Sequence, residues 1–531
     1  MSSVSVAQAS ARGTLILFIG NLVSTLISTG TIIVFARLLG PSGYGVYTLA
    51  FVVPAILQLF VGFGVSTAVT RYVAFSLSTG DAERAASMTR TAMVFCLLFG
   101  LAMSVANLVA MPYFDVVVLH RPELVQYTQM ASVYVAAVAL SQVATSALIG
   151  WGSMIQVSAF AVLQASFKIA LGVALILAGW GVLGAIDAHV ASYLVQGLVA
   201  GLAIYLLRIR LSAKHANAFS KDVRAMVGYG LPVFGGGVVS GLAAQYSTVI
   251  LASVVADTVI GYYQAAINVT VAITVISAAL ANVLFRSFAE LHGLEEDISL
   301  AFAYAVRYVS FILTPVVFFI IASAGPLVGI FYGAAYSQAV ELLRLVAVSY
   351  LPVAIGLTVL PSFLNGVGRS SMNMWVSFSG SAALVVASLV FVLGLRLGAE
   401  GLVFALLVSN MAIAVPGLIL ARVYLHTHVP VKPLAGLFGA GFVAWLAVVV
   451  LPLQALSSVE TVVVQGVVYV AAYLVLVPLF FGLETEDLVR LSIAVETLGP
   501  LRVIFALIIG LERRLLLLRR GGASDEGVSR Q

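Results

Sequence analysis

Apolar residues run through this chain in long blocks, and polar residues gather in short intervals between them. Each block has roughly 20 residues or more, the length at which a helix crosses the ~30 Å hydrocarbon core of a bilayer. Inside lipid, a helix pairs its own backbone amides, so helices are the expected spanning structure. We predict an all-α integral membrane protein of fourteen crossings, near 14–36, 46–70, 91–112, 126–149, 155–178, 183–207, 229–255, 259–284, 303–324, 342–364, 373–394, 400–423, 433–452 and 461–482.

The composition excludes an ordinary soluble domain. Of the 531 residues, 62% are hydrophobic and only 9% are charged, whereas soluble domains carry about 25% charged residues. The single cysteine, Cys96, excludes an intramolecular disulfide and a cysteine-cluster metal site.

Lysine and arginine are distributed unevenly about the crossings. If the N-terminus is cytoplasmic, 21 of the 26 basic residues fall in cytoplasmic segments, four fall outside and Lys168 lies within a crossing. Basic residues favour the cytoplasmic side of a membrane. The distribution predicts a multi-pass plasma-membrane protein with both termini in the cytoplasm, and it supports an even number of crossings.

Two stretches of the chain repeat at one offset. FARLLGPSGYGVYTLAFVV at 35–53 aligns without gaps with LASVVADTVIGYYQAAINV at 251–269, and the matched positions include Gly45 with Gly261 and Tyr47 with Tyr263. SALIGWG at 146–152 aligns with SFLNGVG at 362–368 at the same offset. The repeat predicts two pseudo-symmetric six-helix bundles.

Six crossings return the chain to the side from which it started, so both halves enter from that side. Parallel repeats of this kind are related by an axis along the membrane normal, and the substrate path commonly lies between them. We expect an N-terminal lobe at 1–212, a C-terminal lobe at 213–430, two extra helices at 431–483 and a basic amphipathic cytoplasmic tail at 484–531.

Several motifs, in their order and spacing, resemble one family of transporters. They are ARLLGPSGYGVY, GFGVSTAVTRYVA, FYGAAYSQAVELLRLVAVSYL, LNGVGRSSMNMWVSFSGSAALVV and LETEDLVRL. Together they resemble the polysaccharide, or lipid-linked oligosaccharide, flippases of the MOP (multidrug/oligosaccharidyl-lipid/polysaccharide) exporter superfamily, over residues 10–495. One departure is Arg286 in VLFRSFAEL, where many relatives have a proline.

The resemblance implies transport rather than catalysis. Relatives move a polyprenyl-(pyro)phosphate-linked oligosaccharide from the cytoplasmic to the outer leaflet by alternating access through a V-shaped cavity. In the lipid II flippases, two helices beyond a twelve-helix core are associated with a groove for the lipid tail, and the crossings at 433–452 and 461–482 look like such an addition. We expect no enzymatic activity, metal or cofactor, since the chain carries no Walker loop, HExxH motif or Cys/His cluster.

A large anionic headgroup needs cations along its path, and four arginines are candidates. Arg71 and Arg286 match each other at the offset of the repeat to within one position, and so do Arg90 and Arg307. By the repeat, we expect all four at the cytoplasmic mouth between the halves, where a guanidinium suits phosphate oxygens. The alternative is that they are ordinary positive-inside anchors at helix ends.

Lys168 is the most specific single candidate. It lies in mid-crossing in LQASFKIALGV, one helical turn after Gln164, so both side chains share a face. An ionisable residue deep in a membrane helix usually faces a cavity. The alternative is a lysine whose long stem reaches back to the interface.

Three further polar residues complete the candidate set. Asn21 begins a polar stripe on the first crossing, which lines the cavity or else packs helices together through small residues. Asp187 and His189 lie near the outer end of the sixth crossing, where they couple transport to a cation or proton, or else cap a helix near water. No metal site is expected.

The expected partners are a lipid-linked oligosaccharide, membrane lipids and a coupling cation or proton, without nucleic acid, for a monomeric protein. An alternative is a MATE-like cation-coupled exporter of small molecules. Such an exporter needs membrane-embedded carboxylates, and the sequence offers Asp187 alone. A membrane glycosyltransferase is disfavoured, because it needs acidic catalytic groups and large extramembrane loops.

Overall fold

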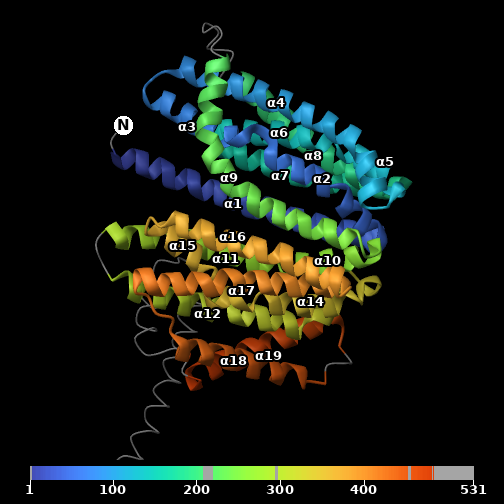
Figure 1. The fold of residues 1–531 in the computed structure, drawn as a ribbon, viewed down its shortest axis with the longest axis vertical. Helices are drawn as coiled ribbons and strands as arrows, with labels where there is room; N and C mark the ends of the chain where they lie inside the picture. Colours follow the sequence, from blue (N-terminus) through green and yellow to red (C-terminus); the bar gives the residue numbers. More distant parts are fainter. Residues whose placement is uncertain (1–2, 207–218, 294–296, 453–455, 481, 483–531) are drawn as a thin grey trace, which may run out of the picture. The chain divides into compact units, whose positions relative to one another are not determined.

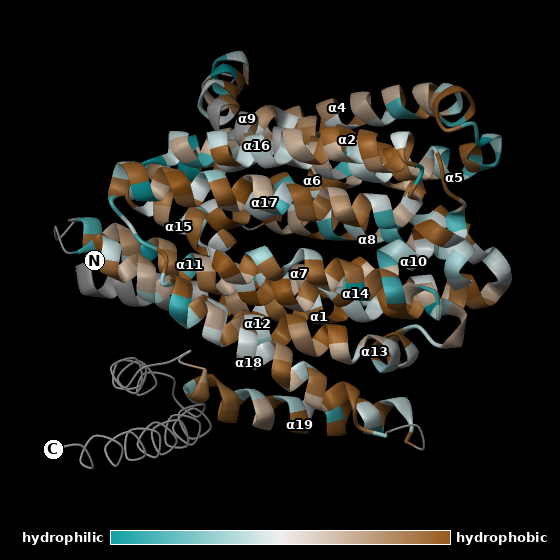
Figure 2. Ribbon diagram, turned by 60° about the horizontal axis from the view of Figure 1, so that its bottom comes forward, coloured by the Kyte–Doolittle hydropathy of each residue, from teal (hydrophilic) through white to brown (hydrophobic). Residues whose placement is uncertain are grey.

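The computed structural model describes residues 3–206, 219–293, 297–452, 456–480 and 482, and these contain helices and turns but no β-strand. Eleven helical stretches among them are long and apolar enough to cross a membrane. Two of the eleven, Ile16–Ser78 and Met154–Ile204, have 63 and 51 residues, which is enough for two crossings each. Figure 2 shows hydrophobic residues over the middle of most helices and hydrophilic ones towards their ends. The predicted all-α membrane fold is confirmed, while the count of fourteen stays a prediction.

The chain divides into two compact units, and unit 1 holds residues 1–265 and 388–402. Its longer elements, coloured from blue to green in Figure 1, follow the chain. They are α1 (Ser3–Ala50), α2 (Val52–Phe60), α3 (Val65–Ser78), α4 (Ala82–Tyr113), α5 (Val125–Ala131), α6 (Val133–Gly150), α7 (Met154–Leu175), α8 (Gly181–Ile204), α9 (Phe219–Ala252) and the start of α10 (Asp257–Val269).

Unit 2 holds residues 266–387 and 403–531. Its elements are the rest of α10, α11 (Val271–Gly293), α12 (Ile298–Ala322), α13 (Ala324–Phe331), α14 (Ala339–Ser349), α15 (Val359–Gly366), α16 (Ser370–Ser388), most of α17 (Gly398–Leu425), α18 (Val431–Val449) and α19 (Ser458–Leu479). The last two helices form the expected additional pair and pack against α12 through a core that includes Phe318, Leu437, Tyr469 and Tyr473. The predicted tail at 484–531 lies outside the described residues.

The first two predicted crossings join differently from the sequence expectation. Helix α1 runs through the expected connection at 37–45 and changes direction at one residue, Gly40, where φ is 69° and ψ is 175°. A residue without a Cβ adopts a positive φ at little cost, so a single glycine turns the chain. Pro41 then starts the next helical segment, a position where its missing N–H costs nothing.

The second predicted crossing is interrupted where α9 approaches it. Between α2 and α3 lies a 3-10 turn, η1 (Val61–Gly64), in which Gly62, Phe63 and Gly64 all have positive φ. A methyl group added to Gly64 would overlap the backbone of Gly230 on α9, and one added to Gly230 would overlap the backbone of Gly64. The interruption therefore brings two bare backbones into contact.

Helix α9 packs on the first six predicted crossings, although the repeat assigns it to the second half. At its start, Asp222 is buried and forms an ion pair with Arg84 of α4, with Nη2 and Oδ1 2.8 Å apart. The Arg71 guanidinium lies 4.4 Å from the ring centroid of Tyr229, a cation–π distance. These contacts place α9 in unit 1. The repeat boundary at residue 212 concerns ancestry of sequence rather than packing, and it stays a prediction.

Candidate functional site

Seven side chains from four helices of unit 1 form the most polar buried group near the predicted site. We call it the His189 cluster, and its members are Tyr47 of α1, Tyr134 of α6, Gln164 and Lys168 of α7, and His189, Ser192 and Tyr193 of α8.

The cluster forms because α7 and α8 fold back on each other as a hairpin and α1 packs closely along α7. The hairpin turns at a π-helical segment, Ile176–Trp180, in which Gly179 has a φ of 94°. Gly172 admits α1, since a methyl group there would overlap the ring of Phe35. Each close approach thus depends on a glycine, as is common where membrane helices pack.

Lys168 is inside the protein rather than at an interface. It retains only 7% of its surface exposed, and Gln164, one turn earlier, also retains 7%. No hydrogen bond or ion pair joins the Lys168 ammonium to another described residue. Its charge acts electrostatically on His189 of the next helix. A buried charge without a partner is costly, so this ammonium is poised to meet an anion.

His189 is held by one hydrogen bond and surrounded by rings. Its Nδ1 lies 2.5 Å from the Tyr47 hydroxyl. Ring centroids lie 4.4 Å away at Phe51, 5.3 Å at Tyr134 and 5.7 Å at Tyr193. Within the described part of the chain, the imidazole therefore has an aromatic wall and a single side-chain hydrogen-bond contact, which comes from α1.

A hydrogen-bond chain ties α7 to α8 beside this ring. The Gln164 amide donates from Nε2 to the Ser192 hydroxyl at 2.8 Å, and that hydroxyl donates to the His189 carbonyl at 2.7 Å. Gln164 thus reaches the cluster as the sequence predicts, through Ser192 rather than through free space. Ammonium, imidazole, amide and phenol groups together offer donors suited to phosphate and sugar oxygens.

Two predicted residues lie apart from the cluster. Asp187 is half-buried and precedes His189 by two positions on α8, which places the two side chains on different faces of the helix. Asn21 is exposed, and its carbonyl accepts a hydrogen bond from the Ser24 hydroxyl at 3.0 Å. The roles predicted for Asp187, His189 and Asn21 stay predictions.

The four predicted arginines divide between the units. Arg71 and Arg90 are exposed in unit 1, and Arg71 stacks on Tyr229. In unit 2, exposed Arg286 pairs with Glu290 at 2.8 Å, and half-buried Arg307 lies over the ring of Tyr304. That all four meet at one mouth stays a prediction.

The sequence expectation that Asp187 is the only membrane carboxylate candidate was wrong, because Asp115 and Asp222 are fully buried. Asp115 was assigned to an outer loop, but helix α4 continues as a π-helical segment, η2 (Phe114–Val118), and carries it inside. Its Oδ2 accepts a hydrogen bond from Thr128 at 2.5 Å. The signal was an aspartate inside the apolar run YFDVVVL.

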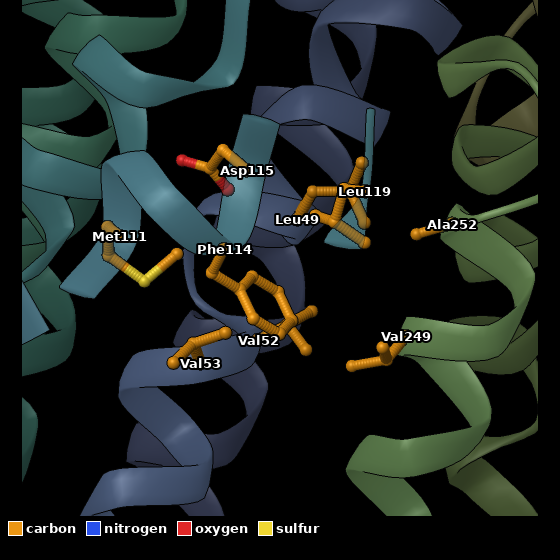
Figure 3. Close-up of a pocket in the computed structure, with 9 residues that line it drawn as sticks. All are labelled: Leu49, Val52, Val53, Met111, Phe114, Asp115, Leu119, Val249 and Ala252. Carbon is orange, nitrogen blue, oxygen red and sulfur yellow. The ribbon is translucent and has the colours of Figure 1, made fainter. Parts of the chain in front are cut away.

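Asp115 also borders a small cavity of about 10 Å³, room for about one water molecule. Figure 3 shows Leu49, Val52 and Val53 on one side of it and Val249 and Ala252 of α9 on the other. Apart from the carboxylate, its lining is apolar.

Comparisons with known proteins identify the family. The sequence profile of a family described as polysaccharide biosynthesis protein matches residues 34–341, more than half of the chain. The chain belongs to this polysaccharide biosynthesis protein family. The succinoglycan biosynthesis transport protein ExoT of Rhizobium meliloti is 24% identical over 348 residues, covering 65% of this chain and 67% of ExoT.

Two solved structures share the fold of this polysaccharide biosynthesis protein. Lipid II flippase MurJ, in an inward closed conformation, matches with a TM-score of 0.73 at 15% identity, over 90% of this chain and all of MurJ. An inward-facing multidrug resistance MATE family transporter of the MOP superfamily matches with a TM-score of 0.63 at 19% identity, over 75% of this chain and 94% of that one. The predicted resemblance to the MOP superfamily is confirmed.

Proposed function

We propose that this protein is a flippase, not an enzyme, which moves a polyprenyl-(pyro)phosphate-linked oligosaccharide from the cytoplasmic to the outer leaflet by alternating access. The family assignment and the fold shared with a lipid II flippase support this proposal. So does the relative ExoT, whose name describes transport in polysaccharide biosynthesis.

Buried Lys168, with no anionic partner among the described residues, is the observation that carries the proposal. A phosphate group brings the negative charge that this ammonium lacks. The amide of Gln164 and the phenols around His189 add hydrogen-bond donors and ring surfaces, which are the groups that sugars use. Water-filled access for such a headgroup is necessary, because unpaired polar groups in hydrocarbon cost several kcal/mol each.

The buried carboxylates do not favour the alternative, an exporter of organic cations. Asp222 is neutralised by Arg84. Asp115 bonds to Thr128 at the end of α4 and contacts no member of the His189 cluster in the described residues. The cluster itself contains a lysine and a histidine but no carboxylate, so its charge suits anions.

The orientation follows from the distribution of basic residues. We propose that both termini are cytoplasmic, because 21 of 26 lysines and arginines then fall on the cytoplasmic side. Glycan leaving the outer leaflet for polymerisation or transfer would then draw the cycle forward, with an ion gradient or the membrane potential as the other energy sources.

Depleting the protein in its own host tests the proposal. We expect lipid-linked oligosaccharide to accumulate on the cytoplasmic leaflet while surface polysaccharide falls, and re-expression to reverse both. The matched control is re-expression of Arg344→Gln, which alters an exposed arginine paired with Glu341. Normal surface polysaccharide combined with raised sensitivity to cationic drugs would instead favour the exporter.

A further inference from the structure

The two copies of the repeated segment contact each other reciprocally. A methyl group added to Gly45 would overlap the carbonyl oxygen of Asp257, and one added to Gly261 would overlap the carbonyl oxygen of Pro41. Gly45 and Gly261 are equivalent in the repeat, and so are Pro41 and Asp257, since both pairs stand at its offset. Such self-complementary contact, in which i meets j and the equivalent of j meets the equivalent of i, is typical of a two-fold interface.

An ion pair and a hydrogen bond secure this contact. Arg121, in the segment after η2, donates from Nη1 to the Asp257 carboxylate and from Nη2 to the Val255 carbonyl. Both Asp257 and Arg121 are largely buried, with side-chain exposures of 20% and 14%. A charge-assisted bond in such surroundings is stronger than one in open water.

The cavity of Figure 3 lies beside this contact. Leu49 follows Gly45 by one helical turn, Ala252 ends α9 just before Val255, and Leu119 precedes Arg121 by two residues. Leu49 is only 4% exposed. When the two segments separate, this leucine gains access to water, so it reports whether the contact is closed.

The same segment of α1 reaches the His189 cluster. Tyr47, two residues after Gly45, carries the hydroxyl that bonds to His189, and its ring stacks on Tyr44 at 6.0 Å. Residues 41–50 form one helical piece beyond the turn at Gly40. A helical piece this short moves as a rigid unit, so a shift at Tyr47 is felt at Gly45 and Pro41.

We propose that segment 41–50 links the His189 cluster to a closure formed by Pro41–Gly45 against Asp257–Gly261. The closure lies at the far end of the first crossing from the N-terminus. A substrate anion that draws Lys168 or His189 towards itself loosens the Tyr47 bond, and the closure then opens. This inference rests on the proposed function for the identity of the ligand, but the closure and its link to Tyr47 do not depend on it.

Thiol accessibility tests the closure. In a Cys96→Ala background, Leu49→Cys is labelled with a membrane-impermeant maleimide in proteoliposomes without substrate. Gly45→Ala and Gly261→Ala should each raise the labelling rate about tenfold, because an inserted methyl in a filled contact costs about 1–3 kcal/mol. Gly30→Ala on the same helix is the matched control, since a methyl there meets nothing within 4 Å. Equal rates in all three variants would overturn the closure.

Two further variants test the link and the latch. Tyr47→Phe removes only the hydroxyl and should also raise labelling of Leu49→Cys, whereas Tyr205→Phe, at an exposed tyrosine, should not. Arg121→Gln should raise it as well, and the exchange Arg121→Asp with Asp257→Arg should restore slow labelling. Should the glycine variants not fold, the Arg121 pair decides the closure. Unchanged labelling in Tyr47→Phe would overturn the link.

Because labelling needs no substrate, its result separates the closure from the proposed function. A protein that closes as described but fails to move lipid-linked oligosaccharide would retain the closure and lose the flippase assignment. Transport of lipid-linked oligosaccharide with unchanged labelling in every variant would overturn the closure alone.

Discussion

Lys168 determines the chemistry of the His189 cluster because it brings a full charge without a described partner. Other buried polar groups of unit 1 are matched: Asp222 with Arg84, and Gln164 with Ser192. Folding alone gains nothing from an unmatched ammonium, since a buried charge opposes folding. A residue that costs stability and persists is best explained by the ligand that it serves.

Replacing Lys168 should therefore separate transport from stability. We expect Lys168→Ala to lower the rate of lipid-linked oligosaccharide movement at least about tenfold, the loss of one charge-assisted contact of about 1.5–3 kcal/mol. Its melting temperature in detergent should be unchanged or higher, because the buried charge is gone. Arg344→Gln, an exposed cation, should leave both values unchanged. Unaltered transport in Lys168→Ala would remove this residue from the path.

The Asp115 carboxylate gives a prediction of opposite kind. Thr128→Val keeps the shape of the side chain but removes the hydroxyl that bonds to Oδ2. We expect the free energy of unfolding to fall by about 1–3 kcal/mol, the cost of leaving a buried acceptor unpaired. Thr274→Val is the control, since that exposed hydroxyl bonds only within its own helix. Denaturation monitored by tryptophan fluorescence would check this, and equal stability of both variants would contradict it.

Part of the site was readable from the sequence and part was not. Lys168 and Gln164 were found because a charge in an apolar run and a spacing of four residues are local signals. Tyr47 and Tyr134 were missed as members of the cluster, because both lie several crossings away from His189 along the chain. Nothing in a single sequence brings such rings together; only the packing of α1 and α6 on α8 does.

Glycines decide how the elements meet. At Gly64 and Gly230, backbones of η1 and α9 touch directly. Apolar runs predicted the existence of the helices well, since each run exceeds the thickness of a bilayer. They did not predict the turn at Gly40 or the interruption at Gly62–Gly64, because a glycine in a membrane helix signals close packing as often as a bend.

Two glycines on α9 make a matched experiment. A methyl group at Gly230 meets the backbone of Gly64, which has no side chain to move aside, whereas one at Gly228 meets nothing within 4 Å. Gly230→Ala should lower the free energy of unfolding by about 1–3 kcal/mol. Gly228→Ala should leave it unchanged or raise it by up to about 1 kcal/mol, because alanine favours a helix. Thermal unfolding in detergent measures both, and similar stabilities would contradict the contact.

At the scale of the molecule, the two compact units do not follow the predicted halves. The sequence repeat separates the chain near residue 212, yet α9 is tied to the first six crossings by Arg84–Asp222 near its start and Arg121–Asp257 just beyond its end. A repeat records which segments are equivalent, and ion pairs record which segments are held together. Charged pairs between distant positions cannot be read from one sequence.

The predicted orientation is checked by labelling two engineered cysteines. In a Cys96→Ala background, Glu123→Cys should react with a membrane-impermeant maleimide in intact cells, because its segment connects two crossings on the outer side. Ser78→Cys should react only after permeabilisation, since it lies between crossings rich in basic neighbours. Both positions are exposed in the structure. The reverse pattern would show that the termini are outside.

The most direct test of the whole account is reconstitution of the purified protein in liposomes that carry a lipid-linked oligosaccharide with a diphosphate linkage. The exposure of the glycan to an external lectin is followed over time, with a cationic dye as the competing cargo. We predict that the protein moves the glycan lipid between leaflets, that Lys168→Ala abolishes this movement and that the dye is not transported. Movement of the dye while the glycan lipid stays in its leaflet would contradict the account.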